Sequence, residues 1–336
     1  MAQNQFKLPK ALLFSVVLIL LVISFFISIG NGQFPISFNE IIAILTGADV
    51  RDITARVFFQ LRLPRTIMAM MAGIGLGIAG NIYQTIFKNP LASPDIIGVS
   101  PGATLGAAVS IVLLGSSTLT IASGAFIGGI VVVLFVLLLV RLSPSNTMAT
   151  YVLAGIVMGS IARAFIMTLK YFADPTHELA AIEFWTMGSL ASVTATKVLT
   201  IIPLFGLSLL GVILLRRQID LLSLGEDEAR MLGVPLSQVR LLVLGLSTLL
   251  VASVISITGL IGFIGLVSPH IAKMMHKRNN FATTILSGLL GAIIMLLSDT
   301  LARSLLQTEI PISILTSLIG VPVLVYYMFR QKEIRS

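Results

Sequence analysis

The sequence contains no cysteine in 336 residues, which excludes disulfides, zinc-thiolate sites and iron-sulfur clusters. Charge is also scarce, because Asp, Glu, Lys and Arg together make up 11% of the residues, and histidine occurs only three times. Hydrophobic residues make up 56% of the chain. Soluble domains of this length do not have such a composition, so the sequence predicts an integral membrane protein.

Apolar runs long enough to cross a bilayer recur along the chain. The first run follows Lys7 and Lys10. We interpret it as a spanning helix and not as a cleaved signal peptide, because it exceeds the roughly 7 to 15 apolar residues of a signal peptide and no small-residue cleavage site follows it. The predicted spans are 11–29, 66–87, 98–114, 119–140, 150–169, 198–215, 241–257, 260–275, 281–298 and 312–329. The fold class is therefore an all-α integral membrane protein of about ten transmembrane helices, with residues 1–336 forming one domain.

The basic residues predict the orientation of these spans. With ten spans and both termini cytoplasmic, 14 of the 22 Lys and Arg residues lie on the inner side and seven on the outer side, and Arg163 falls inside a span. This bias follows the positive-inside rule. The net charge of +8 thus reflects orientation in a lipid bilayer and predicts no nucleic-acid partner. The same topology gives an external loop at 31–65, an external short helix region at 171–196 and a cytoplasmic loop at 216–240.

Glycine patterns mark predicted packing surfaces. Residues 259–280 read as one apolar helix with a basic end, in which Gly259, Gly262 and Gly265 form a smooth ridge for close helix approach. Gly75 to Gly80 match the dinucleotide pattern G-x-G-x-x-G, but no strand precedes them, so we interpret them as helix packing. Prolines and glycines break the chain at 88–103. Irregular backbone at membrane depth must face protein or a water-filled path, which indicates a transporter or channel.

Two polar features lie against this apolar background. Arg163, in the middle of a predicted span, costs roughly 2.5 to 3.5 kcal/mol to insert and should either extend toward the nearby Lys170 end or face a pathway. In the cytoplasmic loop, Glu226 to Glu228 begin a short amphipathic helix that Gly233 and Pro235 end. Such a helix is either a docking element for a soluble partner or a connector.

Several motifs in order carry a resemblance to a known family. They are RLPRT at 62–66, NPLASP and GVSPGA within 89–103, LGEDEARMLGV at 224–234, GFIGLVSPHI at 262–271, and EIP at 309–311 followed by IGVPV at 319–323. Over nearly its whole length the chain resembles permeases of the ABC importer family for iron-siderophore, haem and cobalamin uptake. The resemblance implies a transmembrane permease domain, a bacterial cytoplasmic membrane location, and a translocation path between this chain and a second copy or a paralogous permease.

The resemblance also implies the partners. The sequence has no G-x-x-x-x-G-K-[ST] phosphate loop, so no catalytic residue, metal or cofactor is expected on this chain, and a cytoplasmic ABC ATPase dimer is expected to bind ATP and Mg. In the family that ATPase seats on the coupling segment, which here comprises Leu224, Gly225, Glu226, Asp227, Glu228, Ala229, Arg230, Met231, Leu232 and Gly233.

On the outer side, Arg62, Arg65 and Arg303 match family positions that pair with acidic residues of an extracytoplasmic substrate-binding protein. The residues alone leave an interfacial anchor equally open for the first two. Asp299 lies one turn before Arg303 and is expected to hold it in place.

The family's inner gate falls at Thr147, Met148, Ala149 and Thr150, and Arg163 is an additional pathway candidate. The expected cargo is an iron-siderophore complex, with haem or cobalamin less favoured. The alternative is a secondary transporter driven by an ion gradient, which would show acidic groups within its spans. A membrane-embedded enzyme would need paired carboxylates or histidines, and neither pattern is found. His270, after Pro269, predicts a packing or helix-end role and no metal ligation.

Overall fold

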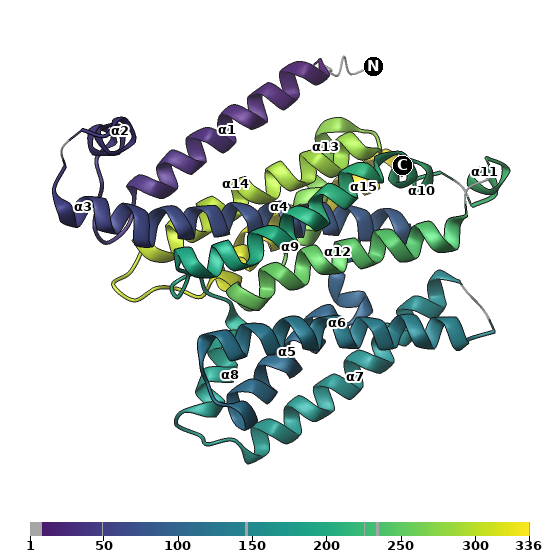
Figure 1. Ribbon diagram of the computed structural model, residues 1–336. Helices are drawn as coiled ribbons and strands as arrows, with labels where there is room; N and C mark the ends of the chain where they lie inside the picture. The colour runs from purple at the N-terminus through teal and green to yellow at the C-terminus, as the bar shows by residue number, and fades with distance from the viewer. Residues whose placement is uncertain (1–8, 49, 145–146, 225, 233–234, 336) are drawn as a thin grey trace.

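The computed structural model describes residues 9–48, 50–144, 147–224, 226–232 and 235–335, which form helices and no strand (Figure 1). The elements are α1 (Lys10–Gly30), α2 (Phe38–Thr46), α3 (Asp52–Val57), η1 (Phe58–Arg62), α4 (Leu63–Ile86), η2 (Pro94–Ile97), α5 (Val99–Val109), η3 (Ser110–Leu114), α6 (Thr118–Leu142), α7 (Met148–Phe172), α8 (Glu178–Met187), α9 (Ala195–Leu214), α10 (Arg216–Leu222), α11 (Glu226–Met231), α12 (Leu236–Thr258), α13 (Ile264–His276), α14 (Phe281–Ser304) and α15 (Ile312–Arg335).

Each predicted span overlaps a helix, namely α1, α4, α5, α6, α7, α9, α12, α13, α14 and α15. The 98–114 span continues from α5 into η3, and the 260–275 span begins four residues before α13. In the described part of the chain, seven helical stretches are long and apolar enough to cross a membrane: Lys10–Gly30, Asp52–Ile86, Thr118–Leu142, Met148–Phe172, Ala195–Leu214, Leu236–Thr258 and Phe281–Ser304. The apolar part of α15 and the helix that begins at Val99 are shorter. The predicted all-α membrane fold is confirmed.

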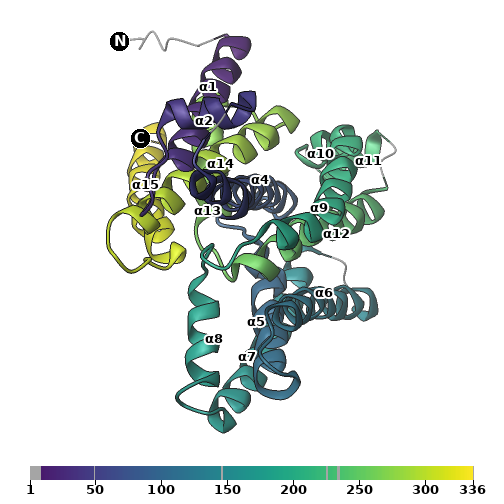
Figure 2. The same ribbon diagram turned by 60° about the vertical axis from the view of Figure 1, so that its left-hand side comes forward.

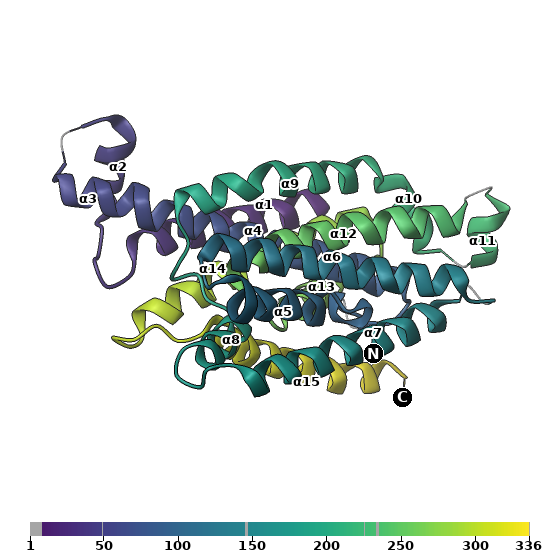
Figure 3. The ribbon, with the colours of Figure 1, turned by 60° about the horizontal axis from the view of Figure 1, so that its bottom comes forward.

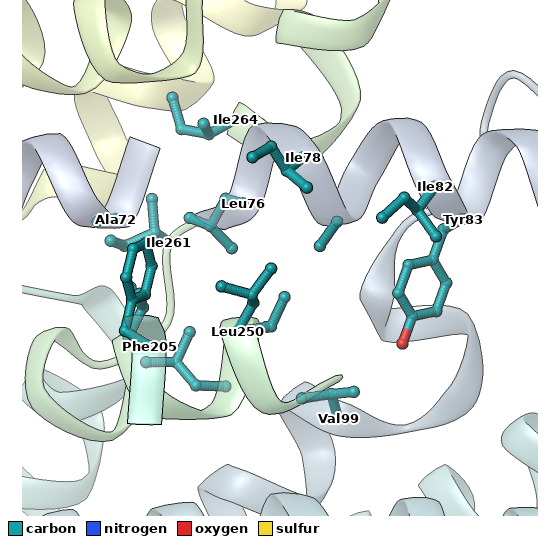
Figure 4. Close-up of a cluster of buried hydrophobic side chains, with 14 of the residues drawn as sticks. Ala72, Leu76, Ile78, Ile82, Tyr83, Val99, Phe205, Leu250, Ile261 and Ile264 are labelled. Carbon is teal, nitrogen blue, oxygen red and sulfur yellow. The ribbon is translucent and has the colours of Figure 1, made fainter. Parts of the chain in front are cut away.

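Helix α4 lies at the centre of the bundle, packed against α12, α13 and α14 (Figures 1 and 2). Its glycines allow this approach. A Cβ atom on Gly73 would lie 2.3 Å from the Gly291 carbonyl oxygen, and one on Gly80 would lie 1.9 Å from that of Gly265. Figure 4 shows Leu76 of α4 among the buried side chains that fill this core. The interpretation of the α4 glycines as a packing surface is confirmed, because any side chain there would separate the helices.

A second group of helices, α5 to α8, packs to one side of this core (Figures 1 and 2). Glycines again set the closest contact: a Cβ atom on Gly106 would lie 1.9 Å from the Gly124 carbonyl oxygen, and one on Gly102 would lie 2.6 Å from that of Gly128. Helix α7 lies at the edge of this group, and its exposed side faces away from α4 and α14.

The prediction of one continuous helix over the 259–280 stretch is wrong at its start. Residues 259–263 are not helical, Gly259 and Phe263 have φ values of +69° and +68°, and α13 begins at Ile264. The break is stable because neighbouring segments bind its carbonyl groups: the Ser189 amide donates to the Thr258 oxygen at 2.7 Å, and the Ser313 hydroxyl donates to the Leu260 oxygen at 2.8 Å. The three glycines therefore form no common ridge, and only Gly265 packs on α4.

The predicted break after α4 is confirmed. The chain turns at Lys88, which has φ +47°, forms the single turn η2 and enters α5 through Gly98, which has φ +82°. Gly155 of α7 lets this irregular backbone approach, because a Cβ atom there would lie 1.9 Å from the Ile96 carbonyl oxygen. Pro94 lies beside Gly265, which itself touches Gly80 of α4, so the break lies about 10 Å along the bundle from the carboxyl end of α4.

Short helices occupy the predicted loops. α2 lies in the 31–65 loop, where Ser37 and Glu40 form a capping box and Gly47 ends the helix with φ +72°. α8 lies in the 171–196 region, and α10 and α11 lie in the 216–240 loop. At the far end of the bundle from α2, Figure 3 shows α11 projecting beyond the spanning helices.

Candidate functional site

The three predicted outer-face arginines lie together at one end of the bundle, but they are buried. Arg62 and Arg65 are 8% exposed and Arg303 is 2% exposed. Asp299, fully buried, accepts from Arg65 Nε at 2.9 Å and lies 3.2 Å from Arg303 Nε. Glu309 accepts from both terminal nitrogens of Arg65, at 2.8 and 3.0 Å. The expectation that Asp299 holds Arg303 is confirmed, and Asp299 holds Arg65 as well.

The remaining donors of these arginines bind the end of α1 and the loop after it. Arg62 donates to the carbonyl oxygens of Asn31 at 2.8 Å and Phe34 at 3.1 Å. Arg303 donates to the same Asn31 oxygen at 3.0 Å and to the Ser28 hydroxyl at 2.8 Å. The terminal nitrogens of all three guanidinium groups are thus hydrogen-bonded within the chain. Together the three arginines connect α1, α4 and α14 at the end of the bundle from which α2 projects.

Sequence reasoning missed two features of this end of the bundle. Glu309 was recognised only as part of a motif, although its side chain is 32% exposed and is the most accessible member of the cluster. The exposed cations nearby are Arg51 and Arg56 on α3 and its N-terminal flank. No local pattern separates them from the buried arginines, because the partners that bury those arginines are distant in sequence: 31 positions for Arg62 and Asn31, and 234 for Arg65 and Asp299.

The coupling segment lies on α11 and its flanks. Leu224 precedes α11 and is exposed, Ala229 is buried, and Met231 and Leu232 are 80% and 62% exposed. Gly225 and Gly233 lie outside the described residues. The charged residues of the segment, Glu226, Asp227, Glu228 and Arg230, all lie on α11. Two large apolar side chains standing in water at the tip of a loop form a surface that another protein can cover.

The gate candidates do not form one cluster. Thr147 precedes α7 and its hydroxyl lies 3.1 Å from that of Thr150, one turn later; Met148 and Ala149 complete this first turn. Arg163 is on the same helix but 13 residues beyond Thr150, which is about 20 Å along the axis. Its Nη2 donates to Ser160 Oγ at 3.3 Å, so the side chain turns back toward the start of α7 and away from Lys170. The alternative of extension toward the Lys170 end is wrong.

The break after α4 contains an acidic residue that sequence reasoning did not assign. Asp95 in η2 is exposed and accepts hydrogen bonds from the hydroxyl groups of Ser93 and Ser100. It lines a small cavity of about 40 Å³, large enough for water, together with Leu76 and the irregular residue Phe263. The two interrupted segments of the chain therefore meet at a small cavity at membrane depth, which is lined by Asp95, two serines and several apolar side chains. The Ser-Pro-Asp sequence at the break was the available signal.

His270 is buried in α13. Its Nδ1 lies 2.5 Å from the Leu266 carbonyl oxygen, and its ring meets Tyr327 of α15 edge-on, with centroids 4.5 Å apart. The neighbouring Lys273 donates to Gln84 of α4 at 2.8 Å. These contacts agree with a packing role. Within the described residues, histidines and carboxylates nowhere gather in groups of three or more that could hold a metal ion.

Comparison with known proteins places this architecture in a family. The model of the FecCD transport family matches residues 20–330. This chain belongs to the FecCD transport family. Its members in this comparison are permeases, so the chain is a transport component of the cytoplasmic membrane and crosses it several times.

Individual relatives cover nearly the whole chain. The molybdate import system permease protein MolB of Haemophilus influenzae is 38% identical over 96% of this chain and 97% of its own length. The hemin transport system permease protein HmuU of Yersinia pestis is 35% identical over 98% and 99%. A solved structure of an inward-facing metal-chelate type ABC transporter superposes with a TM-score of 0.86 at 34% identity, covering 95% of this chain and 99% of that one.

Proposed function

We propose that this FecCD-family chain is the permease subunit of an ATP-driven importer that translocates an iron-siderophore complex delivered by an external binding protein. The observation that carries the proposal is the family match over residues 20–330, together with relatives that span the full chain. The chain itself has no phosphate-binding loop, so a separate ATPase pair would bind ATP and Mg. Both termini would lie in the cytoplasm, on the side of α11.

The names of the relatives support an anionic metal complex or oxyanion as cargo. One relative is named for hemin and one solved structure for metal chelates, which favours an iron chelate. The molybdate permease, at 38% identity, makes an oxyanion the second candidate. The exposed Arg163 suits either substrate, because a guanidinium binds carboxylate and oxyanion oxygens through several hydrogen bonds.

We infer that the ATPase docks on the coupling segment. α11 projects beyond the spanning helices, and Met231 and Leu232 present apolar surface there (Figure 3). Large apolar side chains that insert into a partner's cleft carry much of the binding energy of such contacts. A second permease copy or a paralogue would complete the path, with Thr147 to Thr150 at its inner end.

We propose that the binding protein docks on the outer face, but the three arginines there are buried and already have partners within the chain. Arg62, Arg65 and Arg303 would reach a partner's carboxylates only by exchanging their present partners. Reversing their charge would place new carboxylates beside Asp299, so loss of docking in such variants would not separate recognition from folding. Arg51 and Arg56 are the exposed cations through which docking is better tested.

The experiment is mass spectrometry of proteins that co-purify with this chain from its native membrane, comparing the natural chain with Met231→Glu. We expect an ABC ATPase with the natural chain and at least about tenfold less ATPase with Met231→Glu, because the variant would place a charge where the proposed contact covers an apolar side chain. Leu119→Glu is the matched control, since Leu119 is 71% exposed at the opposite end of the bundle.

Repeated recovery of a stable chain without any ATPase would contradict the proposal and favour the gradient-driven transporter. In that case Asp95 would be the intramembrane acid to examine first, because ion-driven carriers use such residues.

A further inference from the structure

Arg163 is an exposed cation at the midpoint of a membrane-spanning helix. Helix α7 runs over 25 residues from Met148 to Phe172, and its central residue is Ser160. The guanidinium of Arg163 bends back to Ser160, 3.3 Å from its hydroxyl, and lies about 3.5 Å from the position of a Cβ atom on Gly159. The charged group therefore sits at the level of the helix centre, although its own Cα lies one turn nearer the outer end.

This position cannot face hydrocarbon. A guanidinium at the bilayer centre costs several kcal/mol unless it reaches water or a counter-charge, and here the side chain points away from the nearer helix end. Among the described residues no carboxylate pairs with Arg163. The acid on the neighbouring backbone, Asp95, is hydrogen-bonded to Ser93 and Ser100 instead. The exposed side of α7 at this level must therefore be covered by water or by a second protein surface.

The neighbouring residues favour water. Gly155 of α7 packs against Ile96 in the irregular segment before α5, and Gly159 packs against Pro101 in the first turn of α5. The irregular segment also contains Asp95, which lines the small cavity described above. The break in the chain, in which Asp95 accepts hydrogen bonds from serine hydroxyls, thus borders the same stretch of α7 that carries Ser160 and Arg163. Such a collection is tolerated where it borders an aqueous path, because water satisfies groups that lipid would leave unpaired.

We propose that Arg163 and the Ser160 hydroxyl form an anion contact on a water-lined face of α7, and that the transported substrate carries negatively charged oxygen groups. Carboxylates, phenolates and inorganic oxyanions share this chemistry. The guanidinium has five N–H donors, and the contact with Ser160 occupies one of them, so several remain for a substrate oxygen. The inference rests on the proposed permease function, because only a transported solute would pass this level of the membrane.

The natural absence of cysteine makes the test direct. Ser160→Cys in the full-length chain, in membrane vesicles, is treated with an anionic thiol reagent, 2-sulfonatoethyl methanethiosulfonate, and with its cationic trimethylammonium counterpart. We expect both to react. We expect the ratio of anionic to cationic rates to fall about tenfold at low salt when Arg163→Gln is added, and to be retained with Arg163→Lys, because the nearby positive charge attracts one reagent and repels the other.

Two controls make the outcome specific. Arg141→Gln removes a cation at the far end of α6 and should leave the rate ratio at Ser160→Cys unchanged. Phe165→Cys, on another side of α7, should react at least about tenfold more slowly than Ser160→Cys, because lipid covers it.

Three results would each overturn the proposal. The first is no reaction at Ser160→Cys with either reagent, which would mean that lipid or a second copy covers this face. The others are a rate ratio that does not change with Arg163→Gln, and reaction at Phe165→Cys as fast as at Ser160→Cys. The labelling needs neither ATPase nor binding protein. Its failure would therefore leave the importer proposal intact, and failure of ATPase co-purification would not alter the labelling.

Discussion

Replacing Asp299 by Asn should destabilise the permease more than any exposed ion pair can. Asp299 is fully buried and is the carboxylate that both Arg65 and Arg303 contact, at 2.9 and 3.2 Å. Asn keeps the shape and one acceptor oxygen but removes the charge. Two buried guanidinium groups would then lose their common carboxylate, and the remaining acid, Glu309, is one-third exposed and touches only Arg65. Removing one partner of a buried ion pair costs about 3–5 kcal/mol, because the remaining charge stays desolvated.

The assay is denaturant unfolding of the purified chain in mixed micelles, followed by circular dichroism. Glu183→Gln is the matched control, since it makes the same acid-to-amide change in the Lys170–Glu183 pair, whose side chains are 28% and 48% exposed. Exposed pairs contribute about 0–1 kcal/mol. A double variant, Asp299→Asn with Arg303→Gln, should lose less than the sum of the two single losses, because the second change removes the uncompensated cation. Equal unfolding midpoints for Asp299→Asn and Glu183→Gln would refute the reasoning.

Two further predictions concern packing and pH. Gly80→Ala should sharply lower the yield of folded chain without preventing membrane insertion, because its methyl group would lie 1.9 Å from the Gly265 backbone. Size-exclusion chromatography measures this yield, and a monodisperse variant at normal yield would contradict the prediction. Hydrogen bonds from the Ser37 amide and hydroxyl, with help from Arg51, lower the pKa of Glu40 to about 2 from its usual 4.5. A lowered folded-state pKa means that the capping contribution is full above pH 4.5 and disappears as the pH falls toward 2. Protease cleavage near α2 should therefore increase in that window, and Glu40→Gln should abolish the pH dependence.

Hydropathy predicted the spanning helices well because the signal is local and strong. A run of about twenty apolar residues can satisfy its backbone in lipid only as a helix, whatever surrounds it. Local sequence also located the break at 88–103, because each proline there lacks the N–H that a helix interior needs and closely spaced prolines and glycines disfavour a continuous helix. It failed at 259–263, where an apolar run resembles a span. There the Ser189 amide and the Ser313 hydroxyl supply hydrogen bonds that an uninterrupted helix would have provided internally.

The candidate site divides in the same way. Motif order was enough for the family resemblance, and the short helix predicted in the proposed coupling segment is present as α11, because both depend on residues close together in sequence. The direction in which an arginine side chain points depends instead on residues that are distant in sequence. Arg65 contacts Asp299, which is 234 residues away in the chain. Because of that contact, a residue predicted to be available for docking is a buried member of an ion pair.

Sequence by itself determined the membrane class, the helices and the family of this protein, since hydrophobicity and motif order are properties of short stretches. Only the tertiary structure decided which charges are buried, that Asp95 lines a cavity at membrane depth, and that the Arg163 guanidinium sits at the midpoint of α7. The physical reason is that the free energy of a charge depends on its surroundings, and distant segments of the chain supply them.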